Sequence, residues 1–207
     1  MDADESRFAA PALCIVDMQN DFVRRGAPLE VPDARATFDA HQRLIAAFRR
    51  IGAPVVYTRF LATPESSLLW RWSPQCAPPT LCCHRGTQRR YEDADDALEC
   101  TDIVTEIAPA PGEMIVDKFG YGAFHGTRLF DYLRQNAVRS LIVTGTVTQI
   151  CVEETAREAF HHGFYTTIVE DAVSSFAPDL HAATLKNFAM KFGWVDTSNT
   201  VLGRLAA

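Results

Sequence analysis

Short apolar runs, rich in β-branched residues, recur along the chain and alternate with segments of helical periodicity. Runs of about five such residues are typical of strands that lie inside a sheet covered on both faces. The first of them ends at a carboxylate, Asp17. The runs lie at residues 12–16, 54–58, 113–117, 140–144 and 165–170.

The segments between these runs favour helices. After Phe38 the apolar residues Leu44, Ile45 and Phe48 recur at helical spacing, and Gly52 follows where a helix would stop. Residues 127–135 and 152–162 have a similar pattern. Strands that alternate with helices predict βαβ units. We therefore expect an α/β fold with three layers, α/β/α, around a mostly parallel, doubly wound sheet, in a single domain over residues 1–207.

Composition limits the classes of function. The net charge of −6 comes without any basic block, so the chain offers no electrostatic feature for nucleic acid or an anionic membrane. The N-terminus is acidic, and no apolar stretch reaches the length of a membrane span. A protein of the cytoplasm with a small-molecule partner is expected. The six cysteines follow no disulfide or zinc-ligand spacing, and we interpret them as reduced thiols, with no metal and no cofactor.

Residues 59–111 show no clear period and are rich in proline, tryptophan, arginine and cysteine. We predict an irregular excursion with one short helix near residues 101–106. Long loops of this kind often line substrate pockets.

Residues 144–159, TGTVTQICVEETAREA, suggest a nucleophile. A strand is followed by Gly145, a polar turn and then Cys151, which opens an amphipathic helix whose Val152 and Ala156 face the core. A cysteine at a helix N-terminus has its thiolate stabilised by the helix dipole, so we expect a lowered pKa. The same backbone N–H groups can bind an oxyanion. A buried structural cysteine is the alternative.

Two further charged residues, Asp17 and Lys118, follow predicted strands. The carboxyl ends of parallel strands share one edge of a sheet, so the Asp17 side chain is expected to meet Cys151 as its base. Lys118 would keep the aspartate ionised and favour a thiolate or an oxyanion. Each residue alone would be an ordinary cap aspartate or an exposed lysine. The three together predict an active site.

The segments around these residues resemble the isochorismatase-like hydrolases, the cysteine hydrolases that include ureidoacrylate amidohydrolases, N-carbamoylsarcosine amidases and nicotinamidases. IVDMQNDF resembles the strand with the catalytic aspartate, VDKFGYGAFHGTRL the lysine segment, and TGTVTQICVEETAREAFHHGF the nucleophile segment. The resemblance implies that Asp17 is the general base, that Lys118 orients and polarises, and that Cys151 forms an acyl-enzyme. It also implies a cis peptide at Thr146–Val147 and an oxyanion hole from the amides of Val147 and Cys151.

Departures from the family patterns narrow the reaction. Nicotinamidases bind a metal through an aspartate and two histidines after the second strand, where this chain has YTRFLATPESS without histidine. Isochorismatases cleave a vinyl ether without a cysteine nucleophile, so Cys151 favours hydrolysis of a C–N bond. We expect a metal-independent amidohydrolase for a small amide, ureido or carbamoyl compound, and the segments YGAFHGT and HAATLKNFAMKFG favour the ureidoacrylate and carbamoylsarcosine type.

Apolar and cationic residues near these segments are the candidates for substrate binding. Small-ligand pockets are mostly apolar with a few polar anchors, and Phe22, Arg59, Trp70, Tyr121 and Phe124 are predicted to line this one. Arg59, like Arg71 and Arg85, has a guanidinium group that suits a substrate carboxylate. The alternative to substrate binding is that these aromatic residues pack in the core and that these arginines are solvated.

Two other functions remain open. The chain could be an isochorismatase-type ether hydrolase in which Asp17 donates a proton and Cys151 is incidental, or a binding domain without catalysis. Retention of all three motif residues argues against the binding domain. The resemblance and the apolar C-terminal half predict a homodimer or homotetramer.

Overall fold

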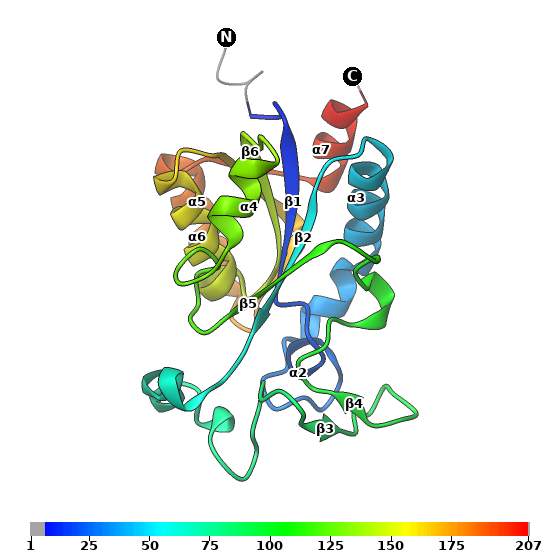
Figure 1. The fold of residues 1–207 in the computed structure, drawn as a ribbon, viewed down its shortest axis with the longest axis vertical. Coiled ribbons are helices and arrows are strands. Elements are labelled where there is room, and N and C mark those ends of the chain that lie inside the picture. Colours follow the sequence, from blue (N-terminus) through cyan, green and yellow to red (C-terminus); the bar gives the residue numbers. More distant parts are fainter. Residues whose placement is uncertain (1–6, 207) are drawn as a thin grey trace.

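A six-stranded sheet forms the centre of the molecule (Figure 1). The structure is a computed structural model, and it describes residues 7–206, apart from the side chains of residues 65 and 66. The strand order is β5-β2-β1-β6-β7-β8, and each neighbouring pair is parallel. The strands are β1 Pro11–Val16, β2 Val55–Phe60, β5 Met114–Lys118, β6 Ser140–Thr146, β7 Tyr165–Ser174 and β8 Trp194–Asp196.

Helices cover both faces of this sheet (Figure 1). On β1, Leu13 and Ile15 belong to one buried cluster, whereas Cys14 and Val16 belong to the other. This alternation follows from the strand period of two, which sends successive side chains to opposite faces. Helices α3 (Phe38–Arg50) and α7 (Ser198–Leu205) lie on the first face, and α4 (Leu129–Gln135), α5 (Glu153–His161) and α6 (Pro178–Lys191) on the second. The predicted three-layer fold is confirmed.

The predicted elements match the observed ones closely where the pattern is strong. Helix α3 begins at Phe38, buries Leu44 and Phe48 completely and ends at Arg50. Gly52 adopts a φ of 67°, a conformation that glycine takes without steric cost, so the chain turns there. No helix in the described part of the chain combines the length and the apolar character that a membrane crossing requires.

The segment between β2 and β5 is irregular, as predicted, and lies beyond the sheet edge (Figure 1). It contains the short antiparallel pair β3 and β4 and three 3-10 turns, of which η2 is the longest. No α-helix forms near residues 101–106, where a short helix was predicted; one 3-10 turn, Thr105–Ile107, overlaps the end of this range. Before it, Ile103 forms a β-bridge with Gln19, and the Val104 N–H donates to the Met18 carbonyl. The short elements are α2 Asn20–Val23, η1 Pro32–Thr37, η2 Pro64–Arg71, η3 Pro74–Cys76, β3 Gln88–Arg89, β4 Leu98–Glu99 and η4 Thr105–Ile107.

Candidate active site

Asp17 lies at the carboxyl end of β1 and is completely buried. Its φ of 49° is in the left-handed region, so the chain turns sharply as it leaves the sheet. The neighbouring strand β2 supplies Thr58, whose hydroxyl donates to Asp17 Oδ1 at 2.6 Å and accepts from the Asp17 backbone N–H at 3.2 Å. These two contacts fix both the backbone and the carboxylate of Asp17.

Lys118 is the last residue of β5 and reaches the aspartate across β2. Its ammonium Nζ lies 2.8 Å from Asp17 Oδ2 and donates to the carbonyls of Gly120 at 2.9 Å and Tyr121 at 2.8 Å. Burial has the largest single effect and acts to lower the pKa of Lys118, but Asp17 and Cys151 together outweigh it, so the pKa is raised above its usual value. Lys118 therefore stays charged where it contacts Asp17.

Cys151 comes from the segment that follows β6. After the cis peptide Thr146–Val147 the chain forms a π-helical turn, Thr148–Val152, which leads into α5. Gly145 makes this approach possible, because its φ is 107° and a Cβ there would lie 2.0 Å from the Val16 carbonyl oxygen. Cys151 is thereby held beside the end of β1, where Asp17 lies.

The protonation of Cys151 differs from the sequence prediction. Burial raises the pKa of the thiol to about 12; the positive charge of Lys118 acts against this rise, and the negative charge of Asp17 adds to it. The expected lowering by a helix terminus is therefore wrong. Desolvation is the largest cause, because Cys151 is buried in the assembled fold. At neutral pH this cysteine is a thiol, and its attack on a carbonyl requires a base.

A cavity of about 890 Å³ opens onto Cys151. Of the residues predicted to bind substrate, Phe22 and Tyr121 line it, and Val147 lies beside Cys151 in its wall. The same wall includes Leu68 and Leu69 of η2, and Trp72, the residue that follows η2. The irregular segment between β2 and β5 thus contributes to the pocket, as its length suggested.

The other three predicted substrate residues do not line this cavity. Arg59 Nε donates to Asp117 Oδ1 at 2.8 Å, so its guanidinium group is held along the sheet edge. Phe124 is buried, with its ring stacked on that of His162. Trp70 packs against the core and tilts against the His84 ring. The closeness of Phe124 to Lys118 in the sequence therefore does not place its side chain in the cavity.

A family model described as the isochorismatase domain matches residues 11–200, which includes the whole sheet and the three buried residues above. The chain belongs to this family. The ureidoacrylate amidohydrolase of Agrobacterium fabrum is 29% identical over 203 residues, which cover 93% of this chain and 88% of the relative. Nicotinamidase 3 of Arabidopsis thaliana is 32% identical over 189 residues, which cover 89% of this chain and 83% of that protein.

The fold of the family is also shared with a solved structure. A cysteine hydrolase from Pseudomonas syringae pv. phaseolicola superimposes with a TM-score of 0.83 and 26% identity, over 98% of this chain and 93% of that one. The resemblance inferred from three sequence segments is therefore confirmed at the level of family and fold.

Three residues that hold this site in place were not predicted from the sequence. The first is Thr58, which contacts Asp17 as described above. Gln19, within IVDMQNDF, accepts from the Phe60 N–H at 2.7 Å and donates to the Phe60 carbonyl, which fixes the end of β2. Glu158 on α5 accepts from the Phe124 N–H at 2.8 Å and so anchors the loop after Lys118. The signal for Gln19 was present, because a polar residue three positions beyond a buried strand needs buried partners.

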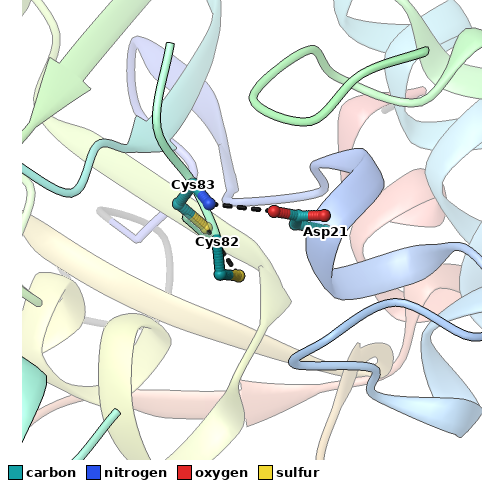
Figure 2. A group of neighbouring side chains, drawn as sticks. All are labelled: Asp21, Cys82 and Cys83. Carbon is teal, nitrogen blue, oxygen red and sulfur yellow. Dashed lines mark hydrogen bonds between the residues drawn. The ribbon is translucent and has the colours of Figure 1, made fainter. Parts of the chain in front are cut away.

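Among the residues that the structure describes, one group of side chains has atoms of the kind that bind metal ions: Asp21, Cys82 and Cys83 (Figure 2). The two sulfur atoms are 3.6 Å apart and the Cys83 N–H donates to the Asp21 carboxylate. Asp21 also accepts from Arg89 Nε at 2.8 Å and from the Tyr91 hydroxyl at 2.7 Å. Burial raises the pKa of Cys83 to about 11. Arg89, Tyr91 and the Cys83 N–H already occupy the Asp21 carboxylate, so this group does not fit a cation.

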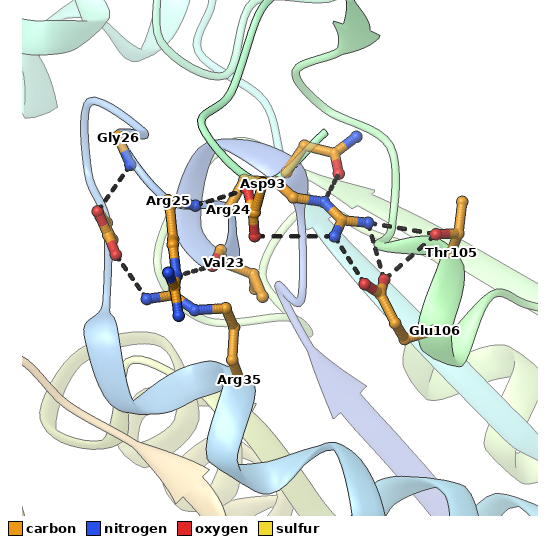
Figure 3. A network of polar contacts seen from close by, with 10 residues as sticks. Val23, Arg24, Arg25, Gly26, Arg35, Asp93, Thr105 and Glu106 are labelled. Atoms are coloured by element: carbon orange, nitrogen blue, oxygen red, sulfur yellow. Dashed lines mark hydrogen bonds and ion pairs between the residues drawn. The ribbon is translucent and has the colours of Figure 1, made fainter. Parts of the chain in front are cut away.

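A polar network fastens the segments beyond the sheet edge (Figure 3). Arg24, which follows α2, forms a bidentate pair with Glu106 at 2.6 and 2.8 Å. Close by, the guanidinium group of Arg35 contacts Glu30 at 2.8 Å, and Glu30 lines the cavity. The network therefore holds one wall of the cavity against the irregular segment.

Proposed function

We propose that this protein is a cysteine amidohydrolase that cleaves the C–N bond of a small amide or ureido compound. One observation carries the proposal: a fully buried Asp17–Lys118 ion pair lies beside the one cysteine that lines the cavity. The relatives support it, because a ureidoacrylate amidohydrolase and a nicotinamidase both have amide substrates by name. The vinyl-ether alternative has no feature in this geometry that favours it.

The first half of the reaction follows from the protonation states. Cys151 is a thiol, so Asp17 accepts its proton as the sulfur attacks the substrate carbonyl. Asp17 Oδ2 contacts Lys118 and accepts no hydrogen bond from the rest of the described chain, which leaves a lone pair for this proton. The backbone N–H groups of Val147 and Cys151 are assigned to the oxyanion.

The second half returns the enzyme to its starting state. The C–N bond breaks, the leaving nitrogen takes the proton from Asp17, and the acyl or carbamoyl group stays on the Cys151 sulfur. Water then attacks this thioester with Asp17 again as the base, and the thiol recovers its proton as the acid product leaves. Lys118 contacts Asp17, donates to two carbonyls and also interacts with Cys151, so we assign it to orient both side chains.

The test is intact-protein mass spectrometry, together with an ammonia-release assay, on a panel of small amides, ureido acids and carbamoyl amino acids. An adduct and turnover are expected with wild type and with Cys14→Ala, and neither with Cys151→Ala. Cys14 is the matched control, because it is a fully buried thiol of β1 that lies outside the cavity lining. Turnover by Cys151→Ala would replace the nucleophile assignment with an acid–base mechanism on Asp17.

A metal-independent reaction and a homo-oligomer are parts of the same proposal. Treatment with EDTA followed by desalting is expected to leave the rate of ammonia release unchanged, and a loss restored by one divalent ion would refute this part. Exposed apolar side chains on α6, Leu180 and Met190, support self-association. Light scattering is expected to give two or four times 23.0 kDa, and a mass of one chain would contradict the oligomer.

A further inference from the structure

The cavity beside Cys151 is apolar over most of its wall. Phe22, Phe60 and Tyr121 line its inner part, and Leu68, Trp72 and Phe176 line it with side chains that are more than half exposed. Exposed large apolar side chains that gather at one cavity indicate a ligand with an apolar body.

The charged residues of the lining are both acidic, Glu30 and Glu154. Glu30 is neutralised, because Arg35 Nη2 lies 2.8 Å from one oxygen and the Gly26 N–H donates to the other. Glu154 is exposed and forms no ion pair or hydrogen bond with the residues that the structure describes. It lies three positions after Cys151, which places the two side chains on one side of the helical turn.

The cationic side chains considered for binding a substrate carboxylate either form ion pairs with aspartates or lie outside the cavity lining. Lys118 is fully buried and held by Asp17 and two carbonyls. Arg59 and Arg85 both pair with Asp117. Arg71 is exposed and is not part of the cavity lining. The wall that meets the substrate therefore has uncompensated negative charge and no positive charge.

We propose that this site takes an amide or ureido compound with an uncharged or cationic apolar body and discriminates against a carboxylate, with Glu154 as the specificity-determining residue. The inference rests on the proposed function and goes beyond it. A carboxylate brought into this cavity would lose its hydration and meet Glu154 without a counter-ion, which is unfavourable in a partly desolvated site. A ureido acid is consequently a poor substrate, in contrast to the compound for which the Agrobacterium relative is named.

The test compares substrates that share one reacting group and differ at the para position: phenylacetamide and benzylurea, each unsubstituted, with a para-carboxylate and with a para-aminomethyl group. The carboxylate and the aminomethyl group have similar sizes and opposite charges. For wild type, kcat/KM is expected to be at least about tenfold lower for the carboxylates than for the neutral and cationic members, a difference of about 1.4 kcal/mol. Glu154→Lys should remove or invert this preference through KM, and Glu154→Gln should weaken it. Glu170→Lys is the matched control, an exposed glutamate of β7 outside the cavity lining, and should keep the wild-type preference.

The outcomes separate the inference from the proposed function. Turnover of the carboxylates as fast as the neutral members, with an adduct on Cys151, would overturn the inference and leave the amidohydrolase intact. The same preference in wild type and Glu154→Lys would overturn the role of Glu154. Absence of turnover and of a Cys151 adduct with every compound would overturn the proposed function, and the inference with it.

Discussion

Replacement of Thr58 by valine tests whether the buried hydrogen bonds of Asp17 position the general base. Valine has nearly the shape of threonine, so the packing stays and only the hydroxyl is lost. That hydroxyl donates to Asp17 Oδ1 at 2.6 Å and accepts from its N–H at 3.2 Å, and both residues are fully buried. A lost hydrogen bond to a buried charged group costs about 2 kcal/mol of unfolding free energy.

This loss corresponds to a decrease in Tm of about 4 to 8 °C for a chain of this size. The catalytic effect should be larger than the stability effect suggests, because a base displaced by a fraction of an ångström acts poorly. We expect kcat to fall about 10- to 100-fold.

The assays are urea unfolding and ammonia release, with Thr58→Ser as the control. Serine keeps the hydroxyl and loses one methyl group, so it should retain most of kcat, at a stability cost of about 1 kcal/mol. A Thr58→Val variant with wild-type kcat would show that Thr58 only packs against Asp17.

Three further predictions concern the buried ionisable groups. Alkylation of Cys151 by iodoacetamide should accelerate continuously from neutral pH to about pH 10, because its thiol pKa is about 12; mass spectrometry would refute this by finding a plateau near neutrality. Burial lowers the pKa of His41 from 6.5 to about 4, so between these pH values the unfolded chain binds more protons than the folded chain. The free energy of unfolding therefore falls by about 3 kcal/mol as the pH falls from above 6.5 to about 4. Urea unfolding of His41→Met should lack this loss, and an equal acid dependence would contradict the assignment. The Lys118→Met variant should lose activity and about 3 to 5 kcal/mol of unfolding free energy, because it leaves the buried Asp17 without its ion-pair partner. The double variant Asp17→Asn, Lys118→Met should recover this stability but stay inactive.

The amino-acid sequence by itself determined the layers of the molecule and the identity of the three central residues. Short β-branched runs and helical spacing are local patterns, and burial on both faces of β1 requires the unbroken run of apolar side chains that the sequence shows from Leu13 to Val16. The order of the strands places Asp17 and Lys118 at one edge because parallel strands end together. Family membership followed from the same segments.

Only the tertiary structure decided the protonation, the pocket wall and the positioning contacts. The pKa of Cys151 depends on how much solvent the assembled fold removes, which no spacing of residues reveals. Arg59 was predicted to face the substrate, but Asp117 on the neighbouring strand holds it away from the cavity. Thr58 is an ordinary strand residue in the sequence, and it becomes a partner of Asp17 only because β1 and β2 lie side by side. Such contacts arise between residues distant in sequence, and packing of the whole chain is what brings them together.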